Sequence, residues 1–103
     1  MSLGELVERL LKTGLPVTYR AWPKGEAPIL PFLCYLVQGT NPTFADGGVY
    51  YSYDDVRIEL YTATKDSALE AKVEAELFGF HWKKEEIYVD TQKCYMIIYE
   101  IEV

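Results

Sequence analysis

The stretch Val49–Thr64, VYYSYDDVRIELYTAT, decides the fold, because it reads as one long strand that leaves a glycine turn and runs directly into a helix start. From Val56 onward, apolar and polar side chains alternate as they do on the two faces of a strand. The apolar face consists of Val56, Ile58 and Leu60, and the other face of Asp55, Arg57, Glu59 and Tyr61. We expect the first face to pack in the core. The second is too charged to be buried, so we expect it to contribute to a partner interface and not to folding.

The length and composition indicate a single compact domain spanning residues 1–103. Half of the residues are hydrophobic and 15% are aromatic, which excludes a disordered chain. No apolar run approaches the roughly 18 residues that a membrane span needs. The first residues carry acidic side chains where a secretory signal carries basic ones, so we expect a cytoplasmic protein.

The sequence offers little for a metal or a cofactor. Cys34 and Cys94 each lie inside an apolar run, where a free thiol behaves as a small buried hydrophobe. There is no CxxC pair, and His81 is the single histidine, so a Cys/His zinc site cannot form within one chain. We therefore expect no metal and no cofactor.

The charge of the chain argues against tight binding of nucleic acid. Sixteen acidic residues outweigh ten basic ones, giving a net charge of −6, and the basic residues are scattered apart from Lys83 and Lys84. Specific binding to DNA or RNA normally needs a clustered basic face. An acidic surface past which DNA moves without sticking remains compatible with this composition.

Two amphipathic helices are expected. Ser2 and Glu5 form a capping box before the first, and Gly14 ends it. Thr64 or Asp66 can cap the second, which should run to about Phe78. Its core stripe comprises Leu69, Val73, Leu77 and Phe80, and the residues expected to point away are Glu70, Lys72, Glu74 and Glu76.

The other strands follow from runs bounded by turn residues. They are expected at 17–22, 31–39, 82–89 and 93–103, the last two joined by a tight turn at 90–92. Gly39–Gly48, GTNPTFADGG, carries the strongest loop composition in the chain, so we expect a long mobile connection that becomes ordered when a partner binds it. The fold class is therefore α+β, in the order α-β-β-β-α-β-β. A single antiparallel or mixed sheet of about five strands should carry two helices on one face.

No catalytic site is recognisable. His81 would need a nucleophile or a substrate proton nearby and an orienting carboxylate, and the sequence shows neither. Asp54 and Asp55 are neighbours on a strand and point to opposite faces, so they do not converge on one ion. We expect a protein without enzymatic activity.

Tyrosines are concentrated on the central hairpin, at Tyr50, Tyr51, Tyr53 and Tyr61. Tyrosine combines a large apolar area with a polar tip and is enriched where proteins meet. Packing between strands of one sheet would explain the cluster equally well. The position of the tyrosines beside Arg57 and Glu59 favours an assembly interface. The candidate interface residues are Arg57, Glu59, Tyr61, Phe44, Asp46, Tyr51 and Tyr53.

Three stretches read together resemble a family of small phage and prophage proteins. They are LPVTYRAWPKGEAPILPFLCYL, VYYSYDDVRIELYTATKDSALEAKVEAEL and IYVDTQKCYMIIYEIEV. The motifs that carry the resemblance are Pro-x-Gly-x-Ala-Pro before Pro31-Phe32, Asn41 with Ala45-Asp46, Glu59-Leu-Tyr-Thr before Lys65-Asp66 and Glu70, and the closing Tyr99-Glu-Ile. The family is that of head–tail joining proteins of long-tailed phages, which are tail-completion or tail-terminator-like and associated with the minor capsid components.

The resemblance implies a structural protein without catalytic residues or cofactors. Such a protein assembles as a ring of about six subunits between the head connector and the tail tube. It would be found in the host cytoplasm during assembly and then in the virion, with DNA only as cargo passing the bore and with no membrane contact. The residues themselves leave a second possibility open, a small intracellular adaptor that binds one protein through its tyrosine-rich sheet.

Overall fold

The computed structural model of the chain describes residues 2–44 and 50–103, and the side chains of residues 2–41 and 53–103. Two helices and five strands follow one another in the order predicted from the sequence. Their bounds are α1 Leu3–Leu11, β1 Val17–Tyr19, β2 Phe32–Phe44, β3 Tyr50–Thr62, α2 Ser67–Glu76, β4 Trp82–Val89 and β5 Cys94–Glu102. None of the helices among these described residues is long and apolar enough to span a membrane.

Both helices begin where the sequence predicts. The Ser2 hydroxyl accepts a hydrogen bond from the Glu5 amide at 3.2 Å, and the Asp66 carboxylate accepts one from the Leu69 amide at 3.0 Å. Gly79, with a φ of +87°, lies in the left-handed region just after α2 and lets the chain turn into β4. The caps fix where each helix starts and therefore which of its faces meets the sheet.

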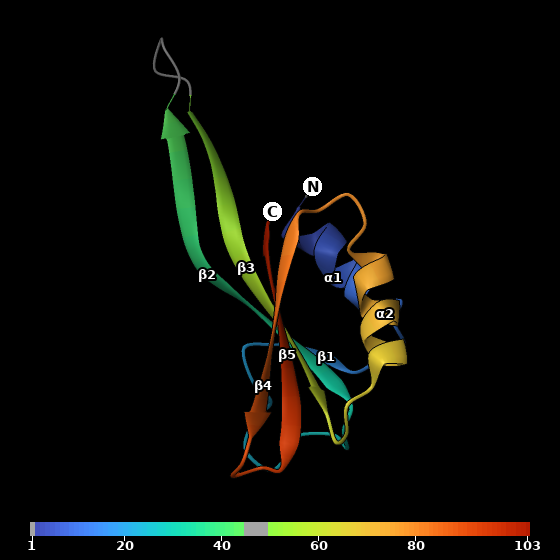
Figure 1. Cartoon of the computed structure of the whole chain (residues 1–103). Coiled ribbons are helices and arrows are strands. Elements are labelled where there is room, and N and C mark those ends of the chain that lie inside the picture. The colour runs from blue at the N-terminus through green and yellow to red at the C-terminus, as the bar shows by residue number, and fades with distance from the viewer. Residues whose placement is uncertain (1, 45–49) are drawn as a thin grey trace.

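The strands form one mixed sheet in the order β1-β2-β3-β5-β4. β1 pairs with β2 in parallel, and the other neighbours are antiparallel. β3 is therefore the central strand, with β2 on one side and β5 on the other. Both helices lie against the same face of the sheet, as Figure 1 shows, which confirms the predicted α+β architecture.

The core lies between the helices and the sheet. The apolar face of β3 supplies Val56, Ile58 and Leu60, all with no exposed surface. They belong to one cluster with the helix residues Leu6, Leu10, Val73 and Leu77 and the β5 residues Ile97, Tyr99 and Ile101. The prediction that this face packs beneath the Leu69, Val73 and Leu77 stripe is confirmed, with Leu69 at the partly buried margin of the cluster.

The predicted loop at 39–48 is wrong for its first part. β2 continues through Phe44 and pairs with β3 as far as the Phe44–Tyr50 pair, so residues 39–44 are a strand. The remainder of the predicted loop, residues 45–48, lies outside the described residues. In Figure 1 the distal halves of β2 and β3 project from the body as a two-stranded hairpin. We call this segment, residues 39–44 and 50–54, the arm.

Two acidic residues of α2 that were expected to point away from the sheet in fact contact it. Glu70 is only 3% exposed and pairs with Lys65 at 2.8 Å and with Lys84 of β4 at 2.9 Å. Glu74 accepts hydrogen bonds from Lys84 at 2.9 Å and from the Tyr99 hydroxyl at 2.7 Å. A buried carboxylate is tolerated here because two ammonium groups compensate its charge. The network attaches α2 to the last two strands.

The central position of Ile58 can be tested by charge insertion. We expect Ile58→Asp to abolish cooperative folding, because an unpaired carboxylate in this dry cluster costs more than about 4 kcal/mol. Ile58→Val, the matched control, should cost about 0.5–1.5 kcal/mol. Urea unfolding followed by circular dichroism measures both, and a folded Ile58→Asp variant would show that the assigned core is incorrect.

The Glu70 network makes stability depend on pH in acid. Burial pushes the pKa of Glu70 upward, but hydrogen bonds from Lys65 and Lys84 outweigh that effect and hold the pKa below its ordinary value. A depressed folded-state pKa stabilises the fold above the ordinary pKa of about 4.5, and this contribution is lost as pH falls through the folded-state pKa. We therefore expect wild-type stability to decrease below about pH 4.5 more steeply than that of Glu70→Gln.

Unfolding free energies measured by urea titration between pH 7 and pH 3 provide the comparison. Glu8→Gln is the control, because Glu8 is an exposed residue of α1. Its pH profile should follow that of the wild type. Parallel pH profiles for the wild type and Glu70→Gln would contradict the view that the lowered pKa of Glu70 stabilises the fold.

Candidate protein interface

The arm leaves the body at a defined elbow. The β2–β3 register shifts between Val37 and Gly39, which places a β-bulge at the start of the arm. Just beyond it, the Thr40 hydroxyl donates to Asp54 at 2.7 Å and the Asn41 amide donates to Asp55 at 2.6 Å. These cross-strand bonds hold the two strands together where the hairpin bends away from the sheet.

Beyond the elbow, the arm has no further strand beside it among the described residues. β1 pairs only with residues 33–35 of β2, and β5 ends beside Asp54 and Asp55. Apart from Asp54, whose backbone is also hydrogen-bonded to Val103, the described arm residues therefore have a hydrogen-bonded partner on one side only. An isolated two-stranded hairpin is marginally stable in water. A partner that pairs with the arm would compensate for this low stability. The arm is therefore the first part of the candidate interface.

The second part is the sheet face opposite the helices, which we call the open face. Strand alternation and register place Arg57, Glu59 and Tyr61 on it, confirming that these three lie together. The Tyr61 hydroxyl donates to Glu59 at 2.9 Å, and the Arg57 Nε lies 2.9 Å from the other carboxylate oxygen. The three side chains form one polar cluster on the central strand.

This cluster is not a fully solvated surface, contrary to the prediction. Glu59 is only 7% exposed, and the neighbouring open-face residues Cys34 and Ile98 are 3% exposed. Burial, followed by the nearby Glu59 charge, raises the pKa of Cys34 to about 11. Burial and the hydrogen bond to Glu59 raise the pKa of Tyr61 above its usual range. Both groups therefore stay protonated at neutral pH, and Cys34 is no reactive thiolate.

Three aromatic side chains, those of Trp22, Phe32 and Tyr61, pack together at one end of the open face. Trp22 packs edge-on against Phe32 with a centroid distance of 5.9 Å, and Phe32 lies 5.1 Å from the Tyr61 ring. Trp22 comes from the irregular connection between β1 and β2, so this connection folds over the Phe32 end of the sheet.

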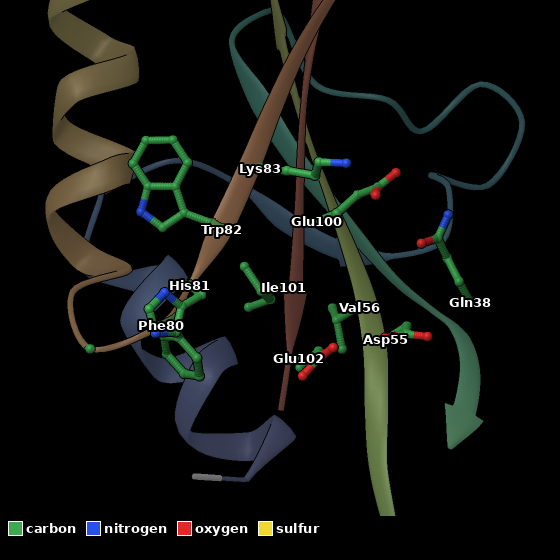
Figure 2. Close-up of a pocket in the computed structure, with 11 residues that line it drawn as sticks. Gln38, Asp55, Val56, Phe80, His81, Trp82, Lys83, Glu100, Ile101 and Glu102 are labelled. Atoms are coloured by element: carbon green, nitrogen blue, oxygen red, sulfur yellow. The ribbon is translucent and has the colours of Figure 1, made fainter.

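A groove of about 590 Å³ opens where β4 begins and β5 ends. Figure 2 shows His81 and Phe80 at the end of α2, while the carboxylates of Asp55, Glu100 and Glu102 extend from β3 and β5. The groove is acidic and open, and His81 is exposed. Within the described part of the chain, no cluster of His, Cys, Asp and Glu has the geometry of a metal site. The expected lack of catalysis stays a prediction.

The remaining candidate residues belong to the arm. Tyr53 is partly buried there, and Phe44 and Tyr51 lie in its paired strands. Asp46 falls outside the described residues. Thr40 and Asn41 were not predicted as elbow residues, because their segment has the composition of a loop. Asp54 and Asp55 accept hydrogen bonds from these two side chains in mid-strand.

Comparison with solved structures shows a similar fold in a known particle. A chain in the structure described as a virion of a native gene transfer agent particle matches with a TM-score of 0.61 and 13% sequence identity. The match covers 95% of this chain and 90% of that one. No protein-family model and no curated protein sequence matches the chain. The protein therefore shares its fold with a chain of that particle.

The Glu59 cluster can be tested for its contribution to stability. Because Glu59→Ala leaves the Tyr61 hydroxyl without its acceptor and Arg57 without its ion-pair partner, we expect a loss of about 1–3 kcal/mol. Arg57→Glu should also destabilise the monomer, because it places a second carboxylate beside the buried one. Glu102→Ala, an exposed change at the end of β5, should have little effect. Equal stabilities in urea would restore the interpretation of this cluster as a pure interaction surface.

Proposed function

We propose that the protein is a structural component of a phage-like particle that acts without catalysis at the head–tail junction, as a tail-completion or tail-terminator-like ring. The fold shared with a chain of a gene transfer agent virion over 95% of this sequence carries the proposal. The resemblance of the sequence to head–tail joining proteins supports the specific place in the particle. The expected partners are further copies of the chain, the tail tube and the head connector.

The division of the molecule into a body and an arm suits such a role. The described core residues lie before Gly39 or after Asp55, so the arm contributes none of them. A subunit in a ring needs a heterologous contact, in which one surface meets a different surface of the next copy. The arm reaches beyond its own body and can supply one half of that contact, and the open face can supply the other.

The charge of the chain is also compatible with this position. With a net charge of −6, the assembled ring would carry a strongly acidic surface. Acidic walls repel the phosphate backbone, so DNA can pass the bore without being retained. DNA is therefore cargo in this proposal and not a bound ligand.

The test is the mass of the assembly. The chain is purified alone and after co-expression with the tail-tube and head-connector subunits of the same genome, and native mass spectrometry measures the species formed. We expect co-expression to give a closed ring of defined subunit number that binds one of these partners. If no species larger than a dimer forms with any partner, the protein is not a ring component, and the adaptor interpretation gains support.

An arm-shortened variant sharpens this test. Thr40 and Asp54 are directly paired, so residues 41–53 can be replaced by Asn-Gly, which closes a two-residue hairpin. We expect the variant to keep the unfolding midpoint of the body and to lose ring formation. Glu8→Gln, which leaves the arm intact, is the control and should assemble normally. Rings formed by the shortened variant would show that the arm does not make the subunit contact.

A further inference from the structure

β4 is an edge strand that the described part of the chain leaves uncovered. It lies at the end of the sheet, pairs with β5 on one side and has seven exposed residues among its eight. Its register with β5 runs without a shift from Trp82 to Val89, so the strand is continuous and regular. Its sequence WKKEEIYV contains no proline or glycine. Proteins usually protect such edges with bulges, prolines or covering segments.

The edge also carries apolar surface. Trp82 is 38% exposed, Ile87 is 38% exposed and Tyr88 is 47% exposed. Trp82 and Tyr88 lie on the helix side of β4, where Trp82 packs edge-on against Tyr99 at 5.6 Å. Because these two aromatic side chains lie at opposite ends of the edge strand, a partner that extends along the whole strand would contact both of them.

The side-chain order along β4 is complementary to itself. Around Glu85, the sequence places Lys84 opposite Glu86 and Trp82 opposite Tyr88 when a second β4 runs antiparallel. In such a pairing, directly opposed residues lie on the same face of the sheet, as these pairs require. We propose that β4 binds the β4 of a second copy in antiparallel register centred on Glu85, joining two sheets into one through a two-fold axis.

On the helix side of β4, Lys84 and Glu86 each have hydrogen-bonding atoms left for this contact. The Lys84 ammonium donates to Glu70 and Glu74, which leaves one of its three donors. Glu86 uses one carboxylate oxygen for Lys65. Each Lys84 can therefore reach the second oxygen of the partner copy's Glu86. On the other face the two Glu85 side chains meet, each with a Lys83 of the other copy at the diagonal position.

This inference goes beyond the proposed function and uses a different surface. A two-fold contact closes after two copies, whereas a ring grows through a heterologous contact. The dimer would cover the β4 edge of the free protein. An edge contact is small beside a standard interface of roughly 1,600 Å², so the dimer should be reversible and depend on concentration.

Disulfide trapping tests the register. Cys34 and Cys94 are buried and do not compete for oxidation. In Glu85→Cys the two thiols would lie directly opposite each other across the axis, so mild oxidation should convert most of the chain into a covalent dimer. The matched control is Lys83→Cys, whose two thiols would lie four residues apart in register and should stay unlinked. An equimolar mixture of Lys83→Cys and Ile87→Cys should form the mixed dimer.

Light scattering of the unmodified chain supplies an independent measurement. We expect the mass to rise from 11.9 kDa toward twice that value with increasing concentration. A monomer at every concentration, or equal trapping of Lys83→Cys and Glu85→Cys, would overturn the proposal. Folding of each variant is checked by circular dichroism, and all three positions are exposed on β4. Because the arm has no part in this contact, the arm-shortened variant should dimerise as well as the wild type.

Discussion

The structure depends on the double role of β3, which must pack on both of its faces. Ile58 and its neighbours on one face are sealed beneath two helices, and Glu59 on the other face is nearly as buried. The strand also pairs with β2 and β5 at its two edges. A substitution in β3 therefore affects the packing on a face of the sheet that is buried in either direction, beneath the helices or within the open face. The apolar face of β3 packs in the core of the body. Its polar face carries the Glu59 cluster at the centre of the open face.

The two buried carboxylates show how an acidic protein keeps its fold. Glu59 is satisfied by a tyrosine hydroxyl and by one guanidinium, and Glu70 by two ammonium groups. Desolvation of a charged group is tolerated only when such partners surround it. Glu70 also connects α2 to β4, so the helix position depends on an ionic contact as well as on apolar packing. Local charge compensation thus operates within a chain whose total charge is strongly negative.

Local signals in the sequence predicted much of the fold. Ser2 and Asp66 marked the helix starts, and alternation around Ile58 identified the core face, because caps and burial act over a few residues. The β2 half of the arm was missed because Gly39, Asn41 and Pro42 have low strand propensity, yet pairing with β3 overrides propensity. Burial of Glu59 and Glu70 depends on residues distant in sequence, because Glu59 lies between Cys34 and Ile98 of the neighbouring strands and Glu70 pairs with Lys84, so no local pattern could reveal it.

The open face, the arm and the β4 edge are three surfaces with different physical requirements. The arm is exposed backbone that gains from an added strand, whereas the open face already has internal partners for its charged residues. A contact on the open face must therefore leave the Glu59 cluster intact. The β4 edge combines unpaired backbone with aromatic side chains and opposite charges. Because the three surfaces differ in these requirements, a neighbour that fits one of them would not fit the other two.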